Sequence, residues 1–253
     1  MAKPAILWQN AYNMGTITIP VGGTAPGYDV QNIKDFRPYT WWQADALGLQ
    51  IIRVTLAAAL TADTVAIIGH NLFSAGGTYA IQTNAGAGTH DMITAPTSDR
   101  AFLRSFPSRT ATEFSLYLAG GNTVPYRLAV VFIGKRLELE RFLLSPFDPQ
   151  PETIEANDST SKTGNLLGVS VDYISRPISA SWKNLTPAWV ASYFKPVWDA
   201  HLGKCVPFFW AWDIGNFADE VYYCRIPPKF SLKMPYDPVR RSLTLSMQSI
   251  KEM

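Results

Sequence analysis

Thr64-Val65-Ala66-Ile67-Ile68-Gly69 is an unbroken apolar run with the length of one strand, and it indicates a strand covered on both faces. Neighbouring segments are also strand-like, and Gly-rich turns at 76–77, 86–88 and 120–122 separate several of them. The strands expected beside it are 16–19, 50–56, 78–83, 113–118 and 126–134. Strands at this spacing predict a β-sandwich or jelly roll over residues 1–135.

Residues 136–165 differ in composition from the segment before them. Pro146, Pro149 and Pro151 cannot donate to a sheet ladder, and residues 157–164 are polar. We therefore expect an ordered extended linker here, followed by a mobile loop.

Residues 166–253 have the pattern of an α+β domain. Thr186 is a suitable helix cap, and Pro187 suits the first helical position because its missing N–H is harmless there. An apolar stripe at helical spacing follows, formed by Trp189, Val190, Tyr193, Phe194 and Val197. Strands are expected at 166–174, 177–182, 206–213, 221–226 and 241–250. The chain is thus predicted to be mainly β, with one helix packed on a sheet in its second domain.

Composition excludes several classes of protein. The 253 residues are 47% hydrophobic and 17% charged, which favours a packed core over disorder. The formal net charge of +2 comes from charges spread along the chain, so a nucleic-acid partner is not expected. Apolar stretches reach only about ten residues, where a membrane helix needs about 20. We expect no membrane insertion and, with no signal peptide visible, synthesis as a soluble protein in a cytoplasm.

Cys205 and Cys224 are expected to be reduced thiols in that compartment. They fall on the two arms of one expected hairpin, with an offset of about 13 Å at strand rise, which is too long for a disulfide.

The sequence offers no convincing catalytic or metal-binding group. His90-Asp91 is a plausible ligand pair without a third ligand nearby, and His201 near a helix C-terminus needs no further role. Neither Gly-x-Ser-x-Gly nor Gly-x-Gly-x-x-Gly occurs in a productive context. A glycosidase needs two carboxylates facing each other across a cleft, which a sequence neither shows nor excludes. We expect no enzymatic activity, no cofactor and no metal, with a glycan-cleaving enzyme as the weakest alternative.

One aromatic stretch, Arg37-Pro38-Tyr39-Thr40-Trp41-Trp42, has two interpretations. In the first, Tyr39, Trp41 and Trp42 stack on a sugar while Arg37 and Asp35 bind its hydroxyls. In the second, one indole belongs to the core and the other packs under a loop. His70, after the apolar run, is either a further ligand-site residue or a hydrogen-bonding cap of its loop. The candidate glycan-binding residues are Arg37, Tyr39, Trp41, Trp42 and His70.

A second aromatic stretch, Phe208-Phe209-Trp210-Ala211-Trp212, places rings on both faces of one strand. Such a strand must be covered on both sides, and a small domain leaves one cover to a neighbouring subunit. The candidate oligomer-interface residues are Phe208, Phe209, Trp210, Trp212, Tyr222 and Tyr223.

The first half of the chain resembles the discoidin or galactose-binding jelly-roll family. The resemblance lies in Asn-x-x-Asp-x-Arg-Pro-Tyr-Thr-Trp-Trp (Asn32 to Trp42), in the strands 51–56 and 65–69, in 77–81, and in a closing strand at 128–135. It implies a jelly roll that binds glycans or lipids through loops at one end, or one that is purely architectural.

The second half resembles the hub domain of siphophage distal tail proteins. The matching segments are 169–173, 178–182, the helix from Pro187, 207–213 and 243–250. The resemblance implies six copies in a ring that joins the tail tube to tail-tip or baseplate proteins. The order of domains departs from that family, where the hub commonly comes first.

Together these expectations describe a structural virion protein of a phage tail tip or baseplate. It would form a homo-hexamer that contacts tail tube and tip proteins and presents the jelly roll outward. The alternative function is a carbohydrate-binding module for glycans of the host surface.

Overall fold

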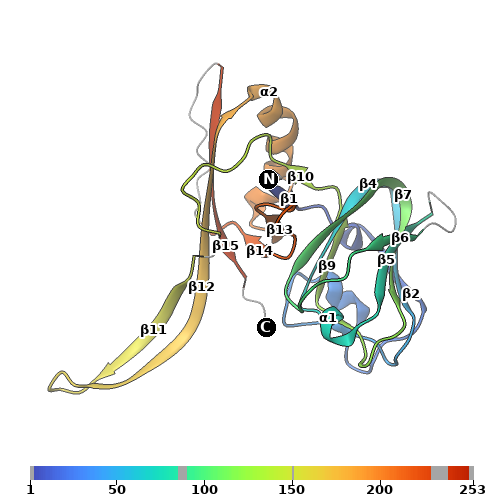
Figure 1. Cartoon of the computed structure of the whole chain (residues 1–253), viewed down its shortest axis with the longest axis horizontal. Helices are drawn as coiled ribbons and strands as arrows, with labels where there is room; N and C mark the ends of the chain where they lie inside the picture. Colours follow the sequence, from blue (N-terminus) through green and yellow to red (C-terminus); the bar gives the residue numbers. More distant parts are fainter. Residues whose placement is uncertain (1–2, 85–89, 150, 229–238, 251–253) are drawn as a thin grey trace. The chain divides into compact units, whose positions relative to one another are not determined.

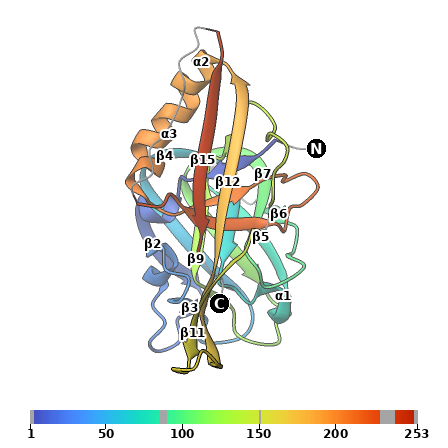
Figure 2. The same cartoon turned by 90° about the vertical axis from the view of Figure 1, so that its left-hand side faces the viewer.

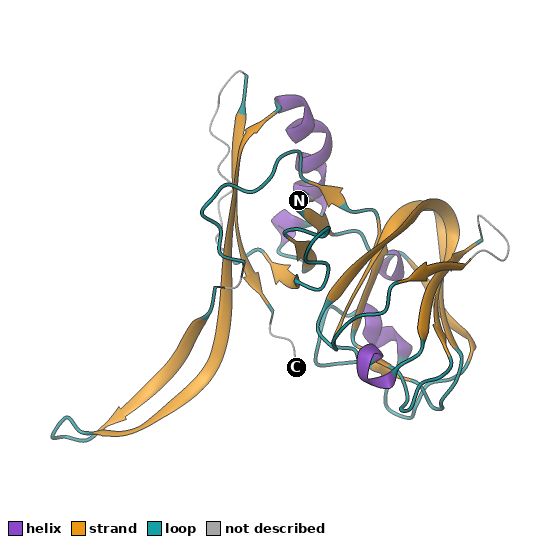
Figure 3. Cartoon of the chain, in the orientation of Figure 1, coloured by secondary structure: helices purple, strands orange, loops and turns teal. Residues whose placement is uncertain are grey.

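The computed structural model describes residues 3–84, 90–149, 151–228 and 239–250. The chain divides into two compact units, of which unit 1 holds the residues up to Leu139 with Phe208–Tyr222, and unit 2 holds Glu140–Pro207 and the chain from Tyr223. Strands predominate in both units (Figure 3). The predicted mainly β class is therefore confirmed.

Unit 1 is built around two long antiparallel strands, β4 (Gln50–Ile68) and β7 (Phe102–Ala119). Its largest sheet has the order β2-β4-β7-β5-β6, and β9 also pairs with β4 (Figure 1). The bounds of the other strands of this sheet are β2 Gly15–Val21, β5 Thr78–Thr83, β6 His90–Ile93 and β9 Val130–Gly134. A small separate sheet joins β3 (Trp42–Gln43) to β8 (Arg127–Leu128). The helices of this unit are η1 (Ala11–Asn13), η2 (Val30–Lys34) and α1 (Leu72–Ala75).

The end of β4 is the fully buried strand that its apolar sequence predicts. Residues 64–68 are all buried because β7 and β9 flank this segment of β4. The predicted strands 50–56 and 64–69 belong to one continuous strand, interrupted by register shifts between Thr55 and Leu60 and between Ala62 and Thr64. The core beneath includes Ile52, Val54, Ile81, Phe102, Phe114, Leu116 and Val131.

One strand from the second half of the sequence belongs to unit 1, whereas the sequence pattern divides the chain at residues 135 and 166. β13 (Phe208–Ala211) pairs with β1 (Ala5–Leu7), which also pairs with β10 (Leu137–Glu138). The ring of Phe209 lies edge-on to Phe132, with centroids 5.2 Å apart. This pairing joins residues about 200 positions apart, beyond the reach of local patterns.

Unit 2 contains the antiparallel strands β11 (Thr153–Thr160), β12 (Leu166–Leu185) and β15 (Arg241–Ser249), and β15 also pairs with the end of β14 (Val221–Arg225). The prediction of a linker and loop is wrong at residues 153–160, because this segment forms strand β11. The helical run is α2 (Pro187–Trp189), the π-helical turn η3 (Val190–Phe194), α3 (Lys195–Ala200) and η4 (Leu202–Lys204). Thr186 caps it as predicted, accepting from the Trp189 amide at 3.3 Å.

The aromatic strand is covered by the chain itself, which removes the reason for placing a neighbouring subunit on it. Phe208, Phe209, Trp210, Tyr222 and Tyr223 are buried. Trp212 is partly exposed, stacks on Phe217 at 4.6 Å and donates from its indole nitrogen to Glu220 at 2.9 Å. The five buried rings are not available as an oligomer interface, so these candidates are corrected, whereas Trp212 stays partly exposed. Cys205 and Cys224 are free thiols.

Candidate functional site

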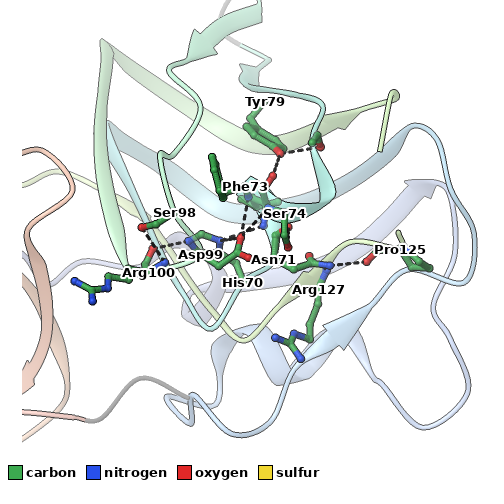
Figure 4. Close-up of polar contacts among 12 residues, drawn as sticks. His70, Asn71, Phe73, Ser74, Tyr79, Ser98, Asp99, Arg100, Pro125 and Arg127 are labelled. Atoms are coloured by element: carbon green, nitrogen blue, oxygen red, sulfur yellow. Dashed lines mark hydrogen bonds and ion pairs between the residues drawn. The ribbon is translucent and has the colours of Figure 1, made fainter. Parts of the chain in front are cut away.

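The short helix α1 follows directly after buried strand β4, and other segments of unit 1 hold its backbone. In so short a helix the first amides have no intrahelical acceptor, and the Ala75 amide donates to the Asn71 carbonyl at 2.8 Å. Here the carboxylate of Asp99 accepts from the amides of Phe73 and Ser74, at 2.9 and 3.1 Å (Figure 4). Asp99, from a turn distant in sequence, therefore acts as the N-terminal cap of α1.

His70 joins the same two segments from the buried side. Its Nε2 lies 2.7 Å from the carbonyl oxygen of Arg100, and its Nδ1 lies 3.2 Å from the amide of Leu72. A carbonyl only accepts and an amide only donates, so the ring is neutral with its proton on Nε2. Burial lowers the pKa of His70 to about 4, which keeps this form at neutral pH.

Asn71 fixes a third segment against α1. Its side-chain amide donates to the carbonyl of Pro125 at 2.9 Å, and its side-chain oxygen accepts from the amide of Arg127 at 2.7 Å (Figure 4). This use explains why Asn71, at the N-cap position, makes no side-chain bond to the helix that it precedes.

Two buried tyrosines hold the C-terminal end of α1. The hydroxyl of Tyr79 donates to the carbonyl of Gly76 at 2.9 Å and also to that of Leu72, and the hydroxyl of Tyr126 donates to Gly76 at 3.2 Å. Burial raises the pKa of both phenols, so they remain donors. Gly77 has φ +108°, and a Cβ there would lie 2.2 Å from the Tyr126 hydroxyl. Only glycine fits this turn without rearrangement.

The turn that carries Asp99 is anchored at its far side by Asp219, also of unit 1. The Thr97 hydroxyl donates to Asp219 at 2.7 Å, and the guanidinium of Arg104 pairs with the same carboxylate. Arg104 also donates to the carbonyl of Ala218 at 2.9 Å. Partial burial alone raises the pKa of Asp219, but the hydrogen bonds from Arg104 and Thr97 together lower it below its usual value.

This framework presents an exposed surface, which we name the α1 platform: Phe73, Ser74, Asp99 and Arg100. Phe73 is 56% exposed, although its amide is fixed. The side chain of Asp99 is 36% exposed, and its two bonds to the helix amides both use Oδ1. A flat apolar ring beside a fixed acceptor suits a ligand with both C–H faces and hydroxyl donors.

The structure corrects two of the candidate glycan-binding residues. Trp42 is fully buried and its indole nitrogen donates to Thr24 at 3.0 Å. His70 is buried in the hydrogen bonds described above, so it positions the platform and cannot touch a ligand. Both positions match the second interpretation, in which one indole belongs to the core and His70 caps its loop by hydrogen bonds.

The other candidates remain fully or partly exposed. Trp41 is partly buried, stacked on Tyr28 at 5.7 Å, with the guanidinium of Arg127 5.1 Å from its ring. Arg37 and Tyr39 are exposed. Asp35 accepts from the Arg37 amide at 2.8 Å and the Thr40 hydroxyl at 2.6 Å, so its own loop uses both carboxylate oxygens.

A surface hollow of about 540 Å³ lies at the preceding loop, lined by residues 24–29. Tyr28 is its one aromatic residue and is the ring that stacks on Trp41. The stacking on Trp41 holds the Tyr28 ring in place at the hollow. Asp29 is the one carboxylate in its lining.

Across the described ranges, no three His, Cys, Asp or Glu side chains gather as metal ligands would. Asp91 instead forms a two-pronged pair with Arg109, with both contacts at 2.9 Å, and His90 lies edge-on to Tyr117. Within the same ranges no helix has the length and apolarity of a membrane span.

No protein-family model matches the chain, and no curated protein matches it. Chitosan-binding module 1 of a chitosanase/glucanase from Paenibacillus sp. IK-5 is similar at 22% identity and a TM-score of 0.39, over 49% of this chain and 98% of the module. The CBM32 domain of AlyQ, solved with 4,5-unsaturated mannuronic acid, has 20% identity and a TM-score of 0.37, over 47% of this chain and 92% of that one.

CpGH89CBM32-5 from Clostridium perfringens, solved with GalNAc-β-1,3-galactose, has 14% identity and a TM-score of 0.41, over 51% of this chain and 99% of that one. At these identities and TM-scores the likeness assigns no ligand to this chain.

Proposed function

We propose that unit 1 is a non-catalytic glycan-binding module whose ligand lies on the α1 platform. The observation that carries this proposal is the exposed ring of Phe73 on a turn whose amides are held by Asp99. The ring supplies a face for the C–H groups of a sugar, and the carboxylate accepts from hydroxyls next to it.

The rigidity of the platform supports this function. Weak ligands lose much of their binding energy when loops must be ordered around them. Here His70, Asn71 and Tyr79 already hold α1 in place through hydrogen bonds to its flanking segments. A preformed site of this kind is suited to a small polar ligand.

A glycan array with the full chain tests the proposal, followed by titration of the sugars that bind. Phe73→Ala and Asp99→Asn are each expected to weaken binding by about tenfold or more, the effect of losing one main contact. The asparagine keeps an oxygen for the two helix amides, so it removes charge without removing the cap. Met92→Ala, at another exposed apolar side chain of unit 1, is the matched control and should bind as the unchanged protein does.

An array without any bound glycan, or unchanged affinity in Phe73→Ala, contradicts the proposal. Substitution of Trp41 or Trp42 is a poor test because both indoles are part of the folded framework. Lost binding in those variants would report on folding.

A structural role in a phage tail tip or baseplate is the second candidate function. The buried rings of β13 no longer support a ring of six copies, but the long β11–β12 ribbon of unit 2 favours some form of assembly. Electron microscopy of the purified full chain is expected to show rings if this candidate is right. If only monomers are seen at high protein concentration, the hexamer is ruled out.

A further inference from the structure

Strand β11 and the first part of β12 form a two-stranded ribbon, which we name the arm: residues 153–160 and 166–171. β11 is the last strand of its sheet and pairs with β12 alone, whereas β12 reaches β15 only from Arg176 onward. Within unit 2 the arm extends away from β14 and β15 (Figures 1 and 2). An isolated two-stranded ribbon is at best marginally stable in water.

The arm has one apolar face and one polar face. Side chains alternate along each strand, and directly paired residues share a face. Val171 pairs with Ala156, Val169 with Asp158 and Leu166 with Thr160, and Ile154 lies two residues before Ala156, so these residues lie on one face. The register shift between Ser159 and Thr160 leaves Leu167 outside this alternation. The opposite face carries Asn157, Ser159, Gly168 and Ser170.

The apolar face is exposed to solvent. Ile154, Leu166, Val169 and Val171 are between 54% and 63% exposed. A contiguous exposed apolar patch marks an interaction surface, and the strand pairing places these residues on one face. Asp158 is the charged exception on this face.

We infer that the apolar faces of the arms of two copies of this chain pack against each other about a two-fold axis. A two-fold interface requires a surface that complements itself, and a flat apolar face meets this condition without a second partner. A membrane is a poorer occupant, because lipid leaves the open edges of a ribbon without hydrogen bonds.

The size of the face predicts the strength of this association. Eight residues at strand rise and two strands in width give a face of roughly 26 Å by 10 Å. Two such faces cover roughly 500 Å² in all, which is below the range of stable dimers and fits only a weak, reversible association. The dimer is therefore expected in the micromolar range.

Sedimentation velocity of the full chain over a concentration series tests this inference. The variant Leu166→Thr/Val169→Thr/Val171→Thr keeps β propensity but makes the apolar face polar. Asn157→Thr/Ser159→Thr/Ser170→Thr introduces the same residue at as many positions on the opposite face. We expect the first variant to weaken the dimer about tenfold or more, and the second to leave it within about twofold.

Amide hydrogen exchange of the arm in the unchanged chain provides a second measurement that needs no variant. Its protection should rise with protein concentration in step with the dimer. The inference is overturned by a chain that stays monomeric into the millimolar range, by equal dimer affinity in both variants, by protection independent of concentration, or by a monomer that binds lipid vesicles through the arm. The inference goes beyond glycan binding, and the arm variants should leave any glycan affinity unchanged.

Discussion

His70→Ala is expected to lower the free energy of unfolding of unit 1 by about 3 kcal/mol, the range for a buried ring whose hydrogen-bond partners are left unpaired. The substitution opens a cavity beside Phe102, whose ring lies 5.0 Å from the imidazole. It also leaves the amide of Leu72 and the carbonyl of Arg100 without their partner. These losses fall on the two segments that carry the α1 platform.

Urea denaturation measures this change, with amide exchange in β4 and β7 separating unit 1 from unit 2. His70→Gln is the matched control, since a glutamine offers one donor and one acceptor to the same two groups. It should retain a substantial part of the stability that the alanine loses. Equal stability of His70→Ala and the unchanged chain would show that the network does not hold the platform.

The same residue predicts a pH dependence. The pKa of His70 is lowered to about 4 in the folded chain from its ordinary value of 6.5, so the unfolded chain takes up a proton first as pH falls. The free energy of unfolding should therefore decrease as pH falls from about 6.5 to 4. Below pH 4 the protonation of His70 should lower it no further. The total contribution is roughly 3 kcal/mol. In His70→Gln this component should be missing from the stability curve.

Arg104→Met is expected to have the second large effect, a loss of about 3 kcal/mol from breaking a largely buried ion pair. Arg104 is 8% exposed and donates to the carbonyls of Thr94 and Ala218 as well as to Asp219. Methionine fills similar volume but leaves these acceptors unsatisfied. Because Asp219 is partly exposed, water recovers some of its solvation, and the loss should stay below that of a fully buried pair.

Arg53→Met is the control for this variant, because Arg53 and Glu113 form a pair at 3.9 Å with both side chains about one-third exposed. Such a pair contributes at most about 1 kcal/mol. Thermal or urea unfolding should separate the two variants clearly. Equal losses would mean that the link from Arg104 to Asp219 does not anchor the turn of residues 97–100.

Local patterns in the sequence predicted the parts of the fold that depend on local physics. The apolar run at 64–69 became the buried end of β4, and Thr186 with Pro187 began the helix. Residues 153–160 were misjudged because Thr, Asn and Ser are typical of loops, yet they also suit the solvent side of an exposed ribbon.

Long-range pairings account for the other errors. Nothing near Phe209 in the sequence indicates that Phe132 covers it or that β1 pairs with its strand. Both aromatic stretches drew attention as binding or assembly surfaces, but most of their rings are buried in the folded chain. Phe73 and Asp99 were missed because a cap supplied from 26 residues away leaves no local motif.

The most direct test of glycan binding is an NMR titration of the full chain with the best sugar from the array. The account predicts that the amide signals of Phe73, Ser74 and Asp99 shift in proportion to bound sugar. These shifts should be absent in Phe73→Ala. Saturating sugar that moves only signals elsewhere, such as those of the loop with Tyr28 and Trp41, would contradict the account.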